Sequence, residues 1–120
     1  MTIHINTLGE AGILEVVYAS QAVSPEGLAE QRRLVAEALS RSTIRKVLLD
    51  ATALRKFPPI LTVLRHNESV AADDILRRAR FAVVCSTIGE DERALENTGV
   101  NRGVSIRCFT SREQALAWLA

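Results

Sequence analysis

The chain has 120 residues, of which 48% are hydrophobic, so it is long enough to bury a core without disulfides or a metal. Fifteen basic and fourteen acidic side chains give a formal net charge of +1, which excludes the strong positive field typical of nucleic-acid-binding proteins. No apolar run approaches the roughly 20 residues that span a bilayer, and the N-terminus lacks a signal-peptide pattern, so we expect a soluble, cytoplasmic protein without stable membrane insertion.

Two β-rich runs, Ile3 to Thr7 and Ile13 to Ala19, begin the chain and are separated by a segment with two glycines, Gly9 and Gly12. Glycine supplies the backbone freedom that a turn needs, so these runs predict an antiparallel hairpin. Alternate residues of the second run are expected to share one fully buried face, while the other face is only partly buried.

The pair Ser24-Pro25 predicts the start of a helix, because a serine hydroxyl caps free amides and proline fits the first turn. Apolar residues then recur at helical spacing on one side, and charged residues occupy the opposite side, which we interpret as solvated. The apolar side consists of Leu28, Leu34, Val35, Ala38 and Leu39.

The run Lys46 to Asp50 predicts the central strand, since it is apolar at successive positions and ends on a carboxylate. Strands of a parallel sheet with helices on both faces have this pattern. The segment 51–59 ends with Pro58 and Pro59, which oppose helix in the residues before them, so we expect an irregular connection.

Residues Ile60 to Arg78 show helical spacing. The apolar face would consist of Ile60, Val63, Leu64, Ala71 and Ile75. One straight helix would add Asn67 and Asp74 to that face, and burying them unpaired would be costly. We therefore expect two helices, or a kinked one, with the break between His66 and Asp73.

The C-terminal third continues the alternation of strands and helices. Arg80 to Cys85 predicts another interior strand, and Glu90 to Asn97 a short helix with an acidic first turn, ended by Gly99. Ser105 to Phe109 alternates between apolar and polar residues, as expected of a strand near the sheet edge. The pair Thr110-Ser111 offers a capping box for the last helix. Its buried side is expected to consist of Ala115, Leu116, Trp118 and Leu119.

This order of elements predicts an α/β fold in one domain over residues 1–120. The sheet is expected to be mixed and mostly parallel, with about five strands, an N-terminal antiparallel hairpin and four to five helices. No internal repeat interrupts the pattern.

Motifs for catalysis and cofactor binding are missing from the sequence. Neither a glycine-rich phosphate loop nor a nucleophile elbow follows any predicted strand, so we predict a protein that is not an enzyme and has no cofactor. Cys85 and Cys108 lie in apolar strand patterns and are interpreted as buried free thiols. With His4 and His66 as the only histidines, and no close spacing to a cysteine, no metal site is predicted.

Polar side chains follow the predicted strands, at the edge where open α/β sheets bind ligands. They are Asp50 with Thr52, Ser86 with Thr87, and the pair Thr110-Ser111. The first two pairs are candidate ligand-binding groups; the alternative is that such residues cap helices or bond loop amides. The positive charges of Arg55, Lys56 and Arg65 are interpreted as solvated surface.

Four stretches resemble the SpoIIAA-like proteins, which are grouped with STAS and SEC14-type domains. They are Val47 to Asp50, Arg78 to Val84, Val104 to Phe109 and Glu113 to Leu119. The resemblance spans nearly the whole chain, and its ending, a strand with phenylalanine before a helix with Ala-Leu-Ala-Trp-Leu, is its most specific part. It implies a superhelix of β-α units with an antiparallel strand at the start.

The resemblance also implies two kinds of function. STAS-type antagonists of anti-sigma factors carry a phosphorylatable serine in a turn after the strand that corresponds to Val47 to Asp50. Here Pro58 and Pro59 occupy the position of that acceptor, which argues against a phosphorylation switch of this type. Thr52 and Thr62, on either side, are the alternative acceptors. We therefore expect a non-catalytic binding or regulatory module that acts on an unknown protein partner and forms a homodimer.

The alternative, from the SEC14 side of the resemblance, is a carrier of a small apolar, lipid-like ligand. Its pocket would lie between the Ile60 to Arg78 helices and the sheet. The expected lining is Phe57, Ile60, Leu64 and Phe81.

Overall fold

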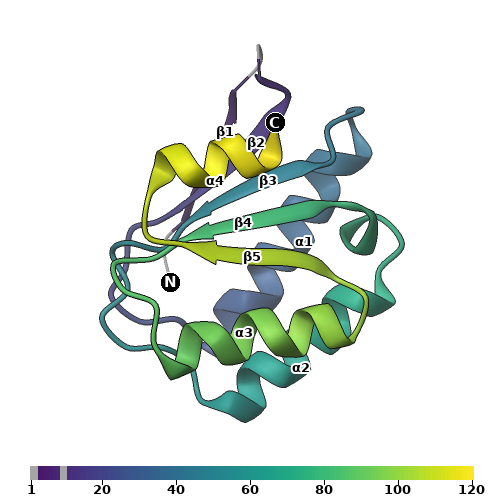
Figure 1. The fold of residues 1–120 in the computed structure, drawn as a ribbon. Coiled ribbons are helices and arrows are strands. Elements are labelled where there is room, and N and C mark those ends of the chain that lie inside the picture. The colour runs from purple at the N-terminus through teal and green to yellow at the C-terminus, as the bar shows by residue number, and fades with distance from the viewer. Residues whose placement is uncertain (1–2, 9–10) are drawn as a thin grey trace.

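One five-stranded sheet separates two layers of helices in the structure, a computed structural model that describes residues 3–8 and 11–120 (Figure 1). The strands are β1 (Ile3–Leu8), β2 (Ile13–Tyr18), β3 (Lys46–Asp50), β4 (Arg80–Val84) and β5 (Ser105–Phe109). The helices are α1 (Pro25–Ser40), α2 (Ile60–Ala72), the 3-10 helix η2 (Leu76–Arg78), α3 (Glu90–Asn101) and α4 (Arg112–Leu119). This confirms the predicted α/β class.

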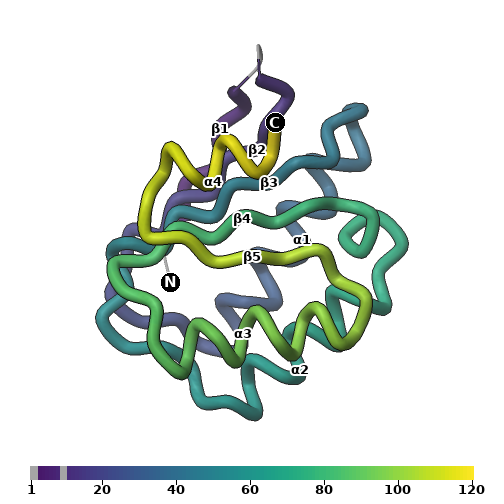
Figure 2. The backbone as a smooth tube through the Cα atoms, in the orientation of Figure 1, coloured from purple at the N-terminus to yellow at the C-terminus, as the bar shows by residue number. Residues whose placement is uncertain are grey.

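Strand order in the sheet follows the chain, as β1-β2-β3-β4-β5, and the tube in Figure 2 can be traced strand by strand. β1 is antiparallel to β2, and the three later pairs are parallel, which confirms the predicted hairpin and mixed sheet. β3 is the central strand and β5 an edge strand, both as predicted. In the hairpin turn Gly12 has a φ of 65°, a left-handed conformation that favours glycine, whereas Gly9 lies outside the described residues.

The two helical layers are unequal, because α1, α2 and α3 cover one face of the sheet and α4 alone covers the other (Figure 1). Alternate strand residues supply the two cores. The larger core includes Val16, Leu39, Val47, Val83 and Ile106. The smaller core, under α4, includes Leu48, Ala82, Val84, Ala115 and Leu119.

Helix α1 begins as predicted, with the Ser24 hydroxyl accepting a hydrogen bond from the Gly27 amide at 3.0 Å. Its buried side differs from the prediction at three positions. Leu34 and Ala38 are only partly buried, whereas Gln31 is 4% exposed and takes a place in the interior. Spacings of three and four residues place Gln31 in line with Leu28 and Val35.

The predicted break in the second helical region is confirmed at Asp73, where α2 has ended and a carboxylate turn leads into η2. Asp73 Oδ1 accepts from the amides of Ile75 and Leu76 at 2.9 and 3.0 Å. The predicted burial of Ile60 is wrong: it is 58% exposed, because the first turn of α2 extends past the packed interior.

Asn67 is buried in the unbroken part of α2, at 1% exposure, but it is not unpaired. Its Nδ2 donates to Leu95 O at 3.0 Å and to Thr98 Oγ1 at 2.7 Å, both in α3. These hydrogen bonds remove the cost of burying the amide, so Asn67 lies in the interior, contrary to the prediction.

Gly99 does not end α3 as predicted but lies inside it, since the helix continues to Asn101. A Cβ at Gly99 would lie 2.6 Å from Ile106 Cγ2 of β5. Glycine is therefore needed for the close approach of helix and strand, and the chain reverses later, at Gly103, where φ is 83°.

Helix α4 is capped by Ser111, whose hydroxyl accepts from the Gln114 amide at 3.3 Å. Two arginine side chains attach the helix to the sheet. The Arg80 guanidinium stacks 4.3 Å above the Trp118 ring and donates to the Trp118 carbonyl at 2.7 Å, and Arg112 pairs with the buried Glu15 carboxylate at 2.6 Å. Within residues 3–8 and 11–120, no helix is long and apolar enough to cross a membrane.

Candidate functional site

Three of the four predicted polar groups at the carboxyl ends of β3 and β4, Asp50, Thr52 and Ser86, meet in one hydrogen-bonded cluster. Asp50 Oδ1 accepts from the Thr52 amide at 3.1 Å and from the Thr52 hydroxyl at 2.7 Å. The Ser86 hydroxyl donates to the Thr52 carbonyl at 3.0 Å. Much of the hydrogen-bonding capacity of these groups is thus used to hold two loops together.

Beside this cluster lies a polar hollow of about 130 Å³, which we call the strand-end hollow. Its lining includes Phe57, Cys85, Ser86, Thr87, Asp91 and Glu92. Three of the eight predicted site residues, Phe57, Ser86 and Thr87, therefore share one hollow, and Asp50 and Thr52 connect to it through Ser86. Asp91 and Glu92 come from the first turn of α3 and were not predicted.

Both cysteines are buried free thiols, as predicted, but the structure also brings them together. The Cys108 thiol donates a hydrogen bond to the Glu92 carbonyl at 3.5 Å. The interaction between the two neighbouring thiols lowers the pKa of Cys85 and raises that of Cys108. The nearby Glu92 carboxylate opposes a thiolate at Cys85. The pair therefore packs as a small polar contact, and in the part of the chain that the structure describes no cluster of ligands suits a metal.

The residues predicted to line an apolar pocket do not share a cavity. Phe57 borders a cavity of about 50 Å³ under the start of α2, and Phe81 borders one of about 20 Å³ under its later turns. Leu64 is half-buried outside the lining of either cavity, and Ile60 faces solvent. Phe57 follows the end of β3, while Phe81 is the second residue of β4, so the two rings lie toward opposite ends of the sheet.

An apolar surface lies at the beginning of α2, a few residues after Phe57 of the strand-end hollow. Ile60 and Leu61 are 58% and 53% exposed, and we call these two side chains the α2 entry patch. The preceding prolines fix the backbone that carries them. Among the described residues the only other large hydrophobic side chain with similar exposure is Val100, 55% exposed near the end of α3.

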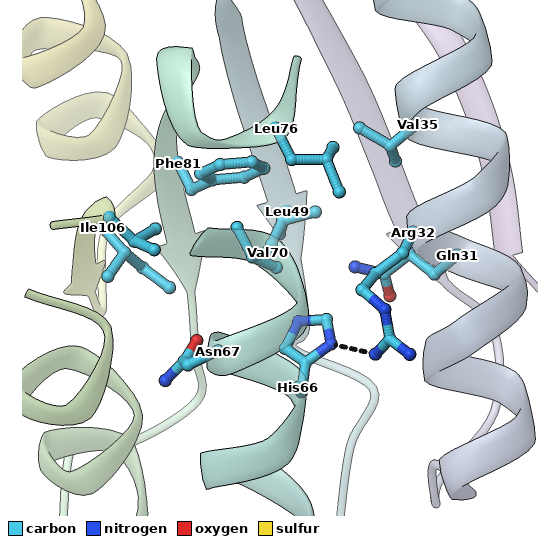
Figure 3. A pocket seen from close by; sticks show the side chains of 11 residues that line it. Gln31, Arg32, Val35, Leu49, His66, Asn67, Val70, Leu76, Phe81 and Ile106 are labelled. Carbon is cyan, nitrogen blue, oxygen red and sulfur yellow. Dashed lines mark hydrogen bonds between the residues drawn. The ribbon is translucent and has the colours of Figure 1, made fainter. Parts of the chain in front are cut away.

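A second polar site, not predicted from the sequence, joins α1 to α2. Arg32 Nη1 lies 2.8 Å from His66 Nδ1, and Figure 3 shows the guanidinium reaching across to the imidazole. Because a guanidinium only donates, Nδ1 must accept, and the neutral ring carries its proton on Nε2. Burial, with a smaller contribution from the charge of Arg32, lowers the pKa of His66 to about 4.

Gln31 completes this inter-helix site. Its Oε1 is buried and has no hydrogen-bond partner among the described residues, and Gln31 and His66 both line the 20 Å³ cavity (Figure 3). The helical spacing of Gln31 with its apolar neighbours was the one sequence signal for this site. The contact between Arg32 and His66 spans 34 residues and left no local pattern.

Comparison of the sequence with protein families and with curated proteins gives no match.

Proposed function

We propose that this protein is a non-catalytic, cytoplasmic binding or regulatory module that acts on a protein partner through the α2 entry patch. The exposure of two adjacent large hydrophobic side chains, Ile60 and Leu61, is the observation that carries this proposal. Exposed apolar surface that is contiguous and rimmed by polar residues is typical of protein interaction sites.

The surroundings of the patch indicate the chemistry of the partner. Arg55 and Lys56 are exposed and precede the patch along the chain. Among the described residues, the ion pairs found include neither of these two side chains. A partner with an apolar contact site bordered by carboxylates would match both features.

The SpoIIAA-like resemblance is part of the same proposal and rests on the sequence stretches given above. The order of β-α units, with an antiparallel strand at the start, agrees with that class of fold. In this proposal the strand-end cluster of Asp50, Thr52 and Ser86 has a structural role, because its hydrogen bonds shape the loops beside the patch.

The volumes of the cavities under α2 give no support to an apolar-ligand carrier. They measure about 20 and 50 Å³, whereas a cavity of about 150 Å³ is known to hold benzene. An acyl chain would need the helices to move apart.

The test compares two surface variants in cross-linking and pull-down experiments from the native host. The double variant Ile60→Glu/Leu61→Glu places charges in the patch, and Val100→Glu is the matched control, since Val100 has the same exposure at the opposite end of its helical layer. We expect a specific partner to be retained by the wild type and the control and lost by the double variant.

Equal retention by all three proteins would overturn the proposal. The patch could also bind a second copy of this chain instead of a different protein. Native mass spectrometry of the same samples tests for this dimer. In that case the wild type and Val100→Glu would be dimers, and the double variant a monomer.

A further inference from the structure

A third hollow lies in the groove between α1 and α2, apart from both the strand-end hollow and the α2 entry patch. Its volume is about 120 Å³, several times the space that one water molecule needs. The polar part of its lining consists of Arg32, Thr62, Arg65, His66 and Ser69, and Pro25 and Leu28 supply the apolar part.

The charge in this groove is not compensated. Arg32 is half-buried, and the partner of its Nη1 is a neutral imidazole rather than a carboxylate. Within the described part of the chain, the ion pairs involve neither Arg32 nor Arg65. The acidic residue nearest to Arg65 on the same helix, Glu68, pairs at 3.0 Å with Arg102, the residue that follows α3.

A cation held partly out of water without a counter-ion is unfavourable, and burial accordingly lowers the pKa of Arg32. An anion in the groove would remove this cost. Arg32 keeps most of its five N–H donors, since only Nη1 is used by His66. The Thr62 hydroxyl makes no hydrogen bond to any other described residue and adds a neutral donor on the α2 side.

We propose that the groove between α1 and α2 binds the phosphate group of a small molecule, held by Arg32, Arg65 and the Thr62 hydroxyl. Two guanidinium groups from facing helices match the charge of about −1.5 to −2 that a phosphate monoester carries at neutral pH. Guanidinium groups also bind tetrahedral oxyanions through paired N–H donors.

The chain offers a direct reporter, because His66 borders the groove and the only other histidine, His4, lies in β1. Inorganic phosphate is added to the protein at pH 7.5 and constant ionic strength, and the two histidine ring signals are followed by NMR. We expect a saturable shift of the His66 signal, with no shift of the His4 signal. Glycerol phosphate, a phosphate monoester, is titrated in parallel. Tighter binding than that of inorganic phosphate indicates an esterified ligand, and equal binding indicates free phosphate.

Two variants test the assigned residues. Arg65→Gln changes an exposed side chain and is expected to weaken phosphate binding about tenfold, as is Arg32→Gln, since each loses charge-assisted hydrogen bonds. Arg33→Gln is the control, because Arg33 is exposed on α1 and pairs with Glu30 and Glu37.

Three results would overturn the proposal. They are a His66 signal that does not shift with phosphate, an equal shift produced by chloride at the same ionic strength, and unchanged affinity in both Arg65→Gln and Arg32→Gln. Arg65→Gln keeps the test valid if Arg32→Gln disturbs the packing of His66.

Discussion

Replacing Gly99 by alanine tests the close approach of α3 to the sheet. The added Cβ would lie 2.6 Å from Ile106 Cγ2, about 1 Å inside the optimal carbon separation of roughly 3.5–4.0 Å. Overpacking of a buried contact costs about 1–3 kcal/mol, and alanine in a helix interior gains about 1 kcal/mol over glycine. We therefore expect Gly99→Ala to lower the free energy of unfolding by about 1 kcal/mol, measured by urea denaturation.

A double-mutant cycle with Ile106→Ala isolates the contact, since that change removes Cγ2. In the Ile106→Ala background the same glycine substitution should instead stabilise the protein by about 1 kcal/mol, giving a coupling of about 2 kcal/mol. Val100→Ala is the control for helix propensity alone, because its side chain is exposed. If Gly99→Ala stabilises both backgrounds equally, helix and strand are not in contact at this point.

Three further predictions concern the other polar contacts of the fold. The pKa of His66 is about 4 in the folded protein and 6.5 in the unfolded chain, so the unfolded state takes up the proton first. The free energy of unfolding should therefore fall by at most about 3 kcal/mol between pH 6.5 and 4, relative to His66→Gln at the same pH; parallel curves for the two proteins would contradict this. Arg80→Ala removes the stacking on Trp118 and a hydrogen bond, and should cost about 1–3 kcal/mol and shift the fluorescence of this single tryptophan to the red. An unchanged emission spectrum would show that Arg80 does not hold α4. Arg112→Ala leaves the buried Glu15 carboxylate without its cation and should cost about 1–2 kcal/mol, much of which Glu15→Leu in the same chain should restore in urea denaturation. A double variant no more stable than Arg112→Ala would contradict that role.

Elements with local signals were predicted well from the sequence. Lys46–Asp50 and Ser105–Phe109 have the predicted bounds, since an apolar run and an alternating run each specify a strand within five residues. The Ser24 cap of α1 lies at the predicted position for the same reason, and Ser111, which caps α4, is one of the two residues predicted for that role. Such signals depend only on neighbouring residues.

Errors arose where distant residues decide the outcome. Gly99 has the local features of a helix end, but it lies inside α3. Glycine is required there because a larger residue would clash with the side chain of Ile106 in β5. Ile60 has the spacing of a buried residue, yet its turn lies beyond the core. The placement of α4 alone on one sheet face also depends on the whole chain path rather than on any single segment.

The candidate site shows the same division. Phe57, Ser86 and Thr87 could be grouped from sequence because all three follow parallel strands at one edge of the sheet. Phe81 could have been separated from Phe57 by the same rule, since it lies near the start of a strand. The groove between α1 and α2 had no such rule, because the register of two helices across 34 residues is set by packing.

The agreement between strand order and chain order has a kinetic consequence. Strands that are neighbours in the sheet are also consecutive in the chain. From β2 on, each newly synthesised strand can therefore pair with the strand made just before it. Short separations between paired elements favour fast folding. The smaller core under α4 is the exception, because Ile13 and Leu48 must wait for Ala115 and Leu119 at the far end of the chain. During synthesis the sheet face under α4 therefore stays uncovered until α4 is made. Its apolar residues are exposed to chaperones and to aggregation until then.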